Sequence, residues 1–292
     1  MKYNFDKGVA RVNYIKDHHL NFFKIAAIVL TTLNLGVNSF AACTATTLEA
    51  DLKKGSASCK TYDVNKTIYI RSKVNFDGKG AKITGVGTFK QCDKYPSSKA
   101  VFWIESSRNV LKNFTIVTSP EGIHVATGVS NVLENITFAK VCEDAITNGN
   151  KTSNSATKTI VSNCKFYNGT DKAIQSNGGT MLVDGSEFSN ILRPISTCGN
   201  SADGQYHDAK LCRMKSVIYV QNTKFVNSRS YAMQAAGEKS SLLYARNNKF
   251  INVPTAFRTQ QTGKIYSSDS TCKSSSTIIC NKNKTNEGFK HF

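Results

Sequence analysis

Six segments of this 292-residue chain align in a single register, and this repeat limits the folds open to the chain. Each segment ends in a large apolar residue, which we call its anchor. The anchors, spaced 22 to 37 residues apart, are Ile116, Phe138, Phe166, Phe188, Phe225 and Phe250. Repeat periods of about 20 to 50 residues are typical of solenoids, whose core grows by the addition of turns. We therefore interpret the chain as a stack of similar turns.

A second aligned position indicates how each turn bends. Three residues before the anchor, the six segments carry Asn113, Asn135, Asn163, Gly185, Asn222 and Asn247. Asn and Gly enter the left-handed backbone region most readily, so a tight bend is expected there in every turn. A further apolar position follows the anchor, at Ile123, Ala145, Ala173, Ile195, Ala232 and Phe257. Apolar residues at helical spacing are missing.

Three short strands per turn predict an all-β, single-domain, right-handed parallel β-helix. The alternative is an ordinary β-sandwich with chance similarity among its strands. A unit around residues 69–80 is expected to form the first coils, and the tail after about residue 266 is expected to be irregular.

The N-terminal 41 residues have the features of a secretory signal peptide. Lys24 precedes an apolar stretch over 25–35, and the small-x-small sequence Ser39-Phe40-Ala41 follows it. The apolar stretch is too short to span a bilayer. We expect residues 42–292 to form a secreted, extracellular domain that is monomeric and not associated with a membrane after cleavage.

Nine cysteines in an exported chain indicate disulfides. We predict two pairs, Cys198 with Cys212 across the longest insertion between turns, and Cys272 with Cys280 near the C-terminus. No cysteine cluster has the spacing of a zinc site.

The formal net charge of +18 indicates a polyanionic partner. Nucleic acid, an anionic membrane and an acidic polysaccharide are the three classes to consider. The chain has no recognised nucleic-acid-binding module and no interleaving of aromatic and basic residues, so nucleic acid is not expected.

Ionisable residues collect at one place in the alignment. Five residues after the anchor, three turns carry Glu121, Glu143 and Asp171, a fourth carries Arg193, and one place further lie Asp144 and Lys172. Strands in neighbouring turns lie about 4.8 Å apart, so unpaired acids would repel one another unless a cation lay among them. Ca²⁺ accepts about six to eight oxygens in loose geometry.

We therefore predict a Ca²⁺ site at Glu121, Glu143, Asp144 and Asp171. The alternative is a set of surface acids paired with Lys172 and Arg193.

Calcium beside a basic side chain suits β-elimination from a uronic acid polymer. The cation would bind a uronate carboxylate and acidify the C5 proton, a base would remove that proton, and the C4 oxygen would leave. Lys172 is the predicted base, because a neighbouring divalent cation lowers the pKa of an amine. Arg193 would hold a substrate carboxylate or stabilise the developing enediolate. A hydrolase on the same fold would need paired carboxylates but no basic residue.

Four strings carry a resemblance to a known family: SPEGIH (119–124), VCEDAIT (141–147), TDKAIQSNGG (170–179) and STCGN (196–200). In order and approximate spacing they resemble the family 3 pectate lyases, from about residue 60 to residue 260. Those enzymes are secreted, calcium-dependent, right-handed parallel β-helices that degrade the pectin of plant cell walls. The resemblance implies Ca²⁺ ligands at Glu121, Glu143, Asp144 and Asp171, and base or substrate-contact roles for Lys172 and Arg193.

Ser196 departs from that family pattern. The family has an Arg two residues before the Cys of its SCGN motif, and that Arg is a leading candidate for the catalytic base. Lys172, Arg193, or Arg213 from the insertion could take over its work in catalysis or substrate binding. The sequence thus favours a secreted calcium-dependent pectate lyase that cleaves de-esterified polygalacturonate. The alternative is a catalytically impaired β-helix protein that binds pectate or another acidic polysaccharide.

Overall fold

The computed structural model describes residues 42–87, 99–149, 157–169, 171–197, 215–237 and 241–292. These residues belong to one compact unit, 42–292. Within the described ranges, no helix is long and apolar enough to cross a membrane.

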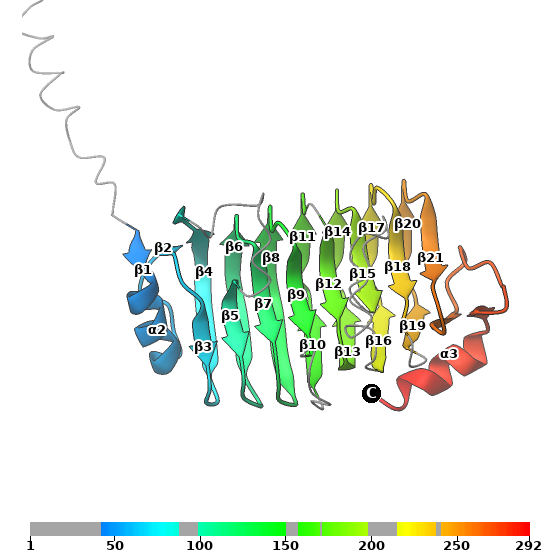
Figure 1. Cartoon of the computed structure of the whole chain (residues 1–292), viewed down its shortest axis with the longest axis horizontal. Helices are drawn as coiled ribbons and strands as arrows, with labels where there is room; N and C mark the ends of the chain where they lie inside the picture. Colours follow the sequence, from blue (N-terminus) through cyan, green and yellow to red (C-terminus); the bar gives the residue numbers. More distant parts are fainter. Residues whose placement is uncertain (1–41, 88–98, 150–156, 170, 198–214, 238–240) are drawn as a thin grey trace, which may run out of the picture. The chain divides into compact units, whose positions relative to one another are not determined.

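The described strands form two sheets in which every pairing is parallel (Figure 1). The eight-stranded sheet contains β3 (Ile68–Ile70), β5 (Ala100–Ile104), β7 (Glu121–Val125), β9 (Asp144–Asn148), β12 (Lys172–Ser176), β15 (Arg193–Thr197), β18 (Tyr231–Ala235) and β21 (Thr255–Thr259). The fifteen-stranded sheet contains β1 (Cys43–Thr44), β2 (Thr61–Val64), β4 (Asn75–Gly85), β6 (Val110–Val117), β8 (Asn131–Ala139), β10 (Lys158–Ser162), β11 (Lys165–Tyr167), β13 (Gly179–Asp184), β14 (Glu187–Ser189), β16 (Ser216–Gln221), β17 (Lys224–Val226), β19 (Leu242–Arg246), β20 (Lys249–Ile251), β22 (Lys264–Ser267) and β23 (Ile278–Cys280).

Successive turns of the chain alternate between these sheets. A typical turn contributes one strand to the eight-stranded sheet and one bent strand, or two short strands, to the fifteen-stranded sheet. Strands of the same kind then pair with their equivalents in the next turn, as in β12 with β9 and β15. The predicted parallel β-helix is confirmed, and β3 and β4 form its early coils as expected.

The predicted bend occurs in all six turns. The aligned Asn and Gly residues from Asn113 to Asn247 have φ between 49° and 60°. A second left-handed bend, which the sequence analysis missed, lies two residues after each anchor, with φ between 51° and 57°, at Thr118, Lys140, Asn168, Asn190, Asn227 and Asn252. Asn at four of these six positions was the signal that could have revealed it.

The anchors form one continuous stack inside the coil, as predicted. Ile116 pairs in register with Phe138. From Phe138 to Phe250 the rings stack with neighbouring centroids 4.5 to 5.3 Å apart and nearly parallel planes. Rings of one size at one position of five successive turns fill the interior without a change of backbone spacing, which is why this part of the sequence repeats so regularly.

The third apolar position differs from the predicted alignment by one residue in three turns. The in-register residues are Ile123, Ile146, Ile174, Ile195, Met233 and Phe257. Ala145, Ala173 and Ala232, which were expected there, precede these positions and are also buried. The loops after the anchor differ in length, so a fixed offset from the anchor does not hold on this sheet.

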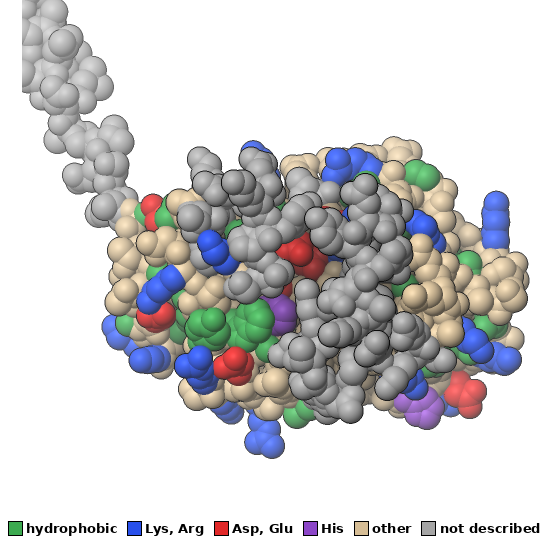
Figure 2. All heavy atoms as spheres, in the orientation of Figure 1, with side chains coloured by type: hydrophobic (Ala, Val, Ile, Leu, Met, Phe, Trp, Pro, Cys, Tyr) green, Lys and Arg blue, Asp and Glu red, His purple; other side chains and the backbone are tan. Residues whose placement is uncertain are grey.

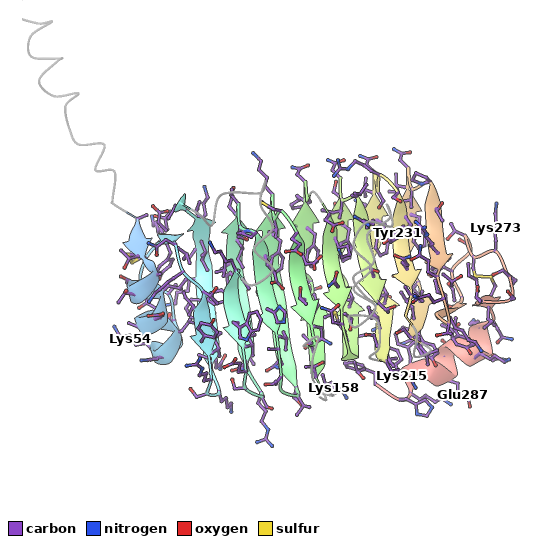
Figure 3. All side chains as sticks on the ribbon, viewed as in Figure 1. Lys54, Lys158, Lys215, Tyr231, Lys273 and Glu287 are labelled. Atoms are coloured by element: carbon purple, nitrogen blue, oxygen red, sulfur yellow. A yellow bond between two sulfur atoms is a disulfide. The ribbon has the colours of Figure 1, made fainter. Side chains whose placement is uncertain are left out.

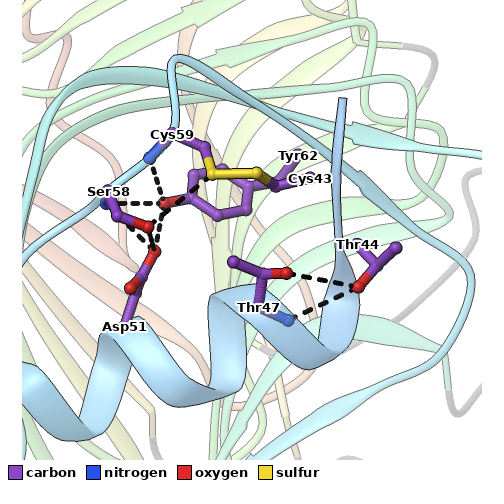
Figure 4. Close-up of a disulfide and its surroundings, with 7 residues drawn as sticks. All are labelled: Cys43, Thr44, Thr47, Asp51, Ser58, Cys59 and Tyr62. Atoms are coloured by element: carbon purple, nitrogen blue, oxygen red, sulfur yellow. Dashed lines mark hydrogen bonds between the residues drawn. A yellow bond between two sulfur atoms is a disulfide. The ribbon is translucent and has the colours of Figure 1, made fainter. Parts of the chain in front are cut away.

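A short helix, α2 (Ala45–Lys54), precedes the first coils, and a disulfide between Cys43 and Cys59 connects its two flanks (Figure 4). Beside it, an Asp51 carboxylate oxygen accepts hydrogen bonds from the Tyr62 hydroxyl and the Ser58 hydroxyl, both 2.6 Å long. The Cys43–Cys59 pair was not predicted.

At the other end, the predicted Cys272–Cys280 disulfide is confirmed. The tail after residue 266, expected to be irregular, contains β23 and a helix, α3 (Lys282–Phe289). Phe289 of this helix packs edge-on against Tyr219 of β16. Cys198 and Cys212, the other predicted pair, lie outside the described residues.

Candidate active site

The first residues of five consecutive strands in the eight-stranded sheet form one row, which we call the ionic row. Its members are Glu121, Asp144, Lys172, Arg193 and Tyr231, at the starts of β7, β9, β12, β15 and β18. Lys172 pairs in register with both Asp144 and Arg193. Glu143 and Asp171, which the sequence alignment placed in the row, each lie one residue before it.

A second row, the polar row, follows three residues later along each strand. Its members are His124, Thr147, Gln175, Ser196 and Gln234, which pair in register from strand to strand. The residues between the rows, such as Ile174 and Ile195, point into the core. Contacts between the rows, including the 2.9 Å approach of His124 Nδ1 to Glu121 Oε1, show that both lie on one face. In Figure 2 this face carries acidic side chains and a histidine near its middle.

The centre of the ionic row is a buried ion-pair network. Lys172 Nζ lies 2.7 Å from Asp171 Oδ2 and 3.4 Å from Asp144 Oδ1. Arg193 pairs with the other oxygen of Asp171. Asp144, Lys172 and Arg193 are each no more than 6% exposed. Charges withdrawn from water to this degree are costly, so their concentration at one place favours a functional role over a structural one.

The other three predicted metal ligands all act on Asp144. Burial raises the pKa of Asp144, Lys172 opposes this, and the neighbouring carboxylates of Glu143, Asp171 and Glu121 raise it further, to about 8. A carboxylate so disfavoured needs a nearby positive charge to remain ionised. The structure therefore brings together acids from three turns, as the sequence analysis expected.

The same acids affect the pKa of Lys172 in turn. Burial lowers the pKa of its amine, but Asp144 and Asp171 outweigh burial and leave the pKa above its ordinary value. With these protein groups alone the side chain is an ammonium ion. The depressed pKa expected from the sequence refers to a bound divalent cation beside the amine.

A hydrogen-bonded polar cluster surrounds Ser196, the residue that departs from the family-like pattern of the sequence. Ser196 is fully buried, and its hydroxyl lies 3.3 Å from Gln234 Oε1. The hydroxyl of Tyr231, from the ionic row, also donates to Gln234 Oε1. Sequence reasoning singled out Ser196 but missed Tyr231 and Gln234. Their spacing of three residues, the same as that of Glu121 and His124, was the available signal.

The acids have the oxygen donors that a hard cation such as Ca²⁺ requires, but their side chains do not point toward one common position. Carboxylate oxygens are the donors that Ca²⁺ prefers, and Asp144 Oδ1 is buried and accepts no hydrogen bond from the described residues. Asp171, however, faces Lys172 and Arg193, and Glu121 faces His124. Consequently no three His, Cys, Asp or Glu side chains of the described part converge as a ready metal site. The donor set fits Ca²⁺ if these acids exchange partners or a ligand supplies further oxygens.

A sequence model of the pectate lyase family matches residues 52–231. This range contains all members of the ionic row and all members of the polar row except Gln234. The chain belongs to the pectate lyase family. It is also similar to Probable pectate lyase E of Aspergillus clavatus, with 29% identity over 164 residues. That alignment covers 56% of this chain and 60% of the fungal protein, so the chain spans about three fifths of the length of this curated relative.

Proposed function

We propose that this protein is a secreted, calcium-dependent pectate lyase that cleaves de-esterified polygalacturonate by β-elimination. The observation that carries the proposal is the buried row of Asp144, Lys172 and Arg193 on three adjacent strands, within the region that matches the pectate lyase family. Acids beside bases on one sheet face supply both kinds of group that the elimination requires.

Glu121, Glu143, Asp144 and Asp171 would hold the calcium ion, completed by carboxylate oxygens of the substrate. When bound, Ca²⁺ would neutralise the uronate carboxylate and so acidify the proton on C5. Pairing of Asp171 with Lys172 and Arg193 keeps the buried acids compensated before substrate arrives.

Lys172 is the proposed base, and it would accept the C5 proton in its neutral form. The electron pair of the C5–H bond becomes the C4–C5 double bond, the bond between C4 and the glycosidic oxygen breaks, and the leaving sugar takes up a proton. Arg193 remains charged throughout and would bind a substrate carboxylate through its guanidinium fork. Arg213, the other proposed substrate contact, lies outside the described residues.

The charge of the chain supports an acidic polysaccharide as the substrate. The full chain has a net charge of +18, and residues 1–41 contribute +3 of it, so the mature protein would keep +15 and attract a polyuronate over long range. Secretion is proposed from the N-terminal sequence, and mass spectrometry of the exported protein should give a mature N-terminus at residue 42.

A binding protein without lyase activity is the second candidate, and Ser196 favours it. Ser196 stands where the family pattern in the sequence calls for an Arg, and a hydroxyl cannot replace the charge of a guanidinium group. Its hydrogen-bonding partner Gln234 is also uncharged.

The deciding experiment follows the ultraviolet absorbance of unsaturated uronate products on polygalacturonate, with Ca²⁺ and with chelator. A lyase gives a Ca²⁺-dependent increase. Absence of any increase, together with calorimetric binding of polygalacturonate, establishes the binding protein instead. Recovery of product formation by Ser196→Arg alone would identify a degenerate lyase site.

A further inference from the structure

We propose that a groove at the α2 end of the eight-stranded sheet is a distal subsite for the acidic polysaccharide, several sugar units from the bond that is cleaved. This inference rests on the proposed function and names a second binding region for the same substrate. We call it the N-terminal groove. It has a volume of about 730 Å³, and the side chains that define it are Lys53, Lys54, Tyr69, Arg71 and Lys73.

An exposed aromatic side chain lies in this groove. Tyr69 is 51% exposed, and among the described residues only Val129 is a comparably exposed large apolar side chain. The Arg71 guanidinium lies 4.8 Å from the centre of the Tyr69 ring. An exposed ring beside a cation suits a sugar ring that carries a carboxylate, because the aromatic face can pack on the sugar and the cation can pair with its charge.

The groove is positively charged. Its lining contains four cationic side chains and one acid, Glu49, which is paired with Lys66 at 2.9 Å. Glu105, just outside it, accepts from both Arg71 and Trp103, and this holds the guanidinium and the indole in place. Lys53, Lys54 and Lys73 are exposed and available to a polyanion. Figure 3 shows Lys54 at the α2 end of the stacked coils.

The polar row continues into the groove without interruption. Tyr69 pairs in register with Trp103 on β5, and Trp103 pairs with His124 on β7. The Trp103 and His124 rings stack at 3.9 Å, and His124 in turn contacts Glu121 of the ionic row. His124 Nε2 is buried without a hydrogen-bond partner among the described residues, so a ligand hydroxyl would satisfy it.

Because the polar row runs from the active site into the N-terminal groove, a polymer is the ligand that can contact both. Four strand steps separate β3 from β12, or about 19 Å at the usual spacing of ~4.8 Å. A polyuronate that reacts beside Lys172 and runs along the sheet would reach Tyr69, whereas a short oligomer would not. Long chains should therefore gain affinity from the N-terminal groove and short chains should not.

The test is calorimetry on the full chain in the presence of Ca²⁺, with trigalacturonate and a long oligogalacturonate. The wild-type protein should bind the long oligomer more tightly. Tyr69→Ala and the double change Lys53→Glu/Lys54→Glu should each weaken binding of the long oligomer by roughly tenfold, the scale of a few exposed contacts. Each variant should therefore show a smaller difference in affinity between the long oligogalacturonate and trigalacturonate. Val129→Ala and Lys249→Glu, which change exposed residues outside the groove, should retain the wild-type difference.

Polyglutamate, an anion without sugar rings, separates saccharide recognition from charge alone. Lys53→Glu/Lys54→Glu should weaken polyglutamate binding, whereas Tyr69→Ala should not. If Tyr69→Ala weakened binding of the long oligogalacturonate and of polyglutamate equally, the saccharide subsite would be overturned. Wild-type protein that binds both oligomer lengths equally would overturn the subsite alone, and wild-type protein that binds neither would overturn the proposed function with it.

Discussion

Lys172 Nζ lies 3.4 Å from Asp144 Oδ1 on the adjacent strand, and both side chains are almost completely buried. The pair exists because β9 and β12 stack in register. Its acid and its base are the two groups on which the proposed chemistry depends most.

Replacing Lys172 should abolish most of the activity. Lys172→Ala removes the proposed base, and we expect the rate on polygalacturonate to fall by at least ~100-fold, the usual scale for a general base. The change also leaves Asp144 and Asp171 without their shared cation, which should lower the free energy of unfolding by about 3–5 kcal/mol. Denaturant unfolding of the same samples separates the two effects. The control is Lys165→Ala, an exposed lysine of β11, and a folded Lys172→Ala protein with the wild-type rate would refute the assignment.

The interior stack should be most sensitive at its centre. Phe166 stacks on Phe138 and Phe188, with centroids 5.0 and 4.5 Å away. Phe166→Ala should reduce the free energy of unfolding by about 3–5 kcal/mol, because it opens a cavity between two rings. Phe250→Ala should cost less, since Phe250 is only partly buried. Equal losses in urea unfolding would contradict the stack.

The second bend can be tested at Asn190, which has φ 56° and donates 3.2 Å to the Asn168 side chain on the adjacent coil. Both Asn190→Gly and Asn190→Ala remove the hydrogen bond. Asn190→Ala keeps a Cβ in the left-handed region without the polar side chain that lets Asn adopt it, at a cost of about 1–2 kcal/mol, and Gly has no such cost. The Gly variant should therefore be the more stable in urea unfolding. The reverse order would show that the bend imposes no left-handed requirement.

Asp51 should make the free energy of unfolding depend on pH in the acidic range. Burial raises the pKa of Asp51, but hydrogen bonds from Ser58 and Tyr62 outweigh it and leave the pKa below its ordinary value. A carboxyl group with a lowered pKa stabilises the fold above its unfolded pKa of about 3.9, and this contribution is lost as the pH falls through the folded pKa.

The difference in unfolding free energy between wild type and Asp51→Asn should therefore be largest near neutral pH and shrink below about pH 4. Urea unfolding across this range measures it. Tyr62→Phe, which removes one of the hydrogen bonds to Asp51, should show a smaller pH dependence than wild type. A difference that does not change with pH would contradict this prediction.

The sequence by itself determined the coil. Phe166, Phe188 and their equivalents recur with Asn or Gly three residues earlier, and both requirements are local: a ring of fixed size inside, and a backbone that turns left-handed. Local requirements leave a mark at one fixed offset in every turn. The family-like strings contain five of the seven predicted site residues, and the aligned position five residues after the anchor adds Arg193. These six are described and lie near one another, whereas Arg213 lies outside the described residues.

Only the tertiary structure decided which of these residues face one another. Loops of different length after each anchor shift the register of the eight-stranded sheet, so Asp144 and Lys172, rather than Glu143 and Asp171, share a row with Arg193. Pairing between strands depends on hydrogen bonds across turns, and these are not visible in any one segment. The same is true of the path from Tyr69 through Trp103 to His124, whose three residues become neighbours only when the coils stack.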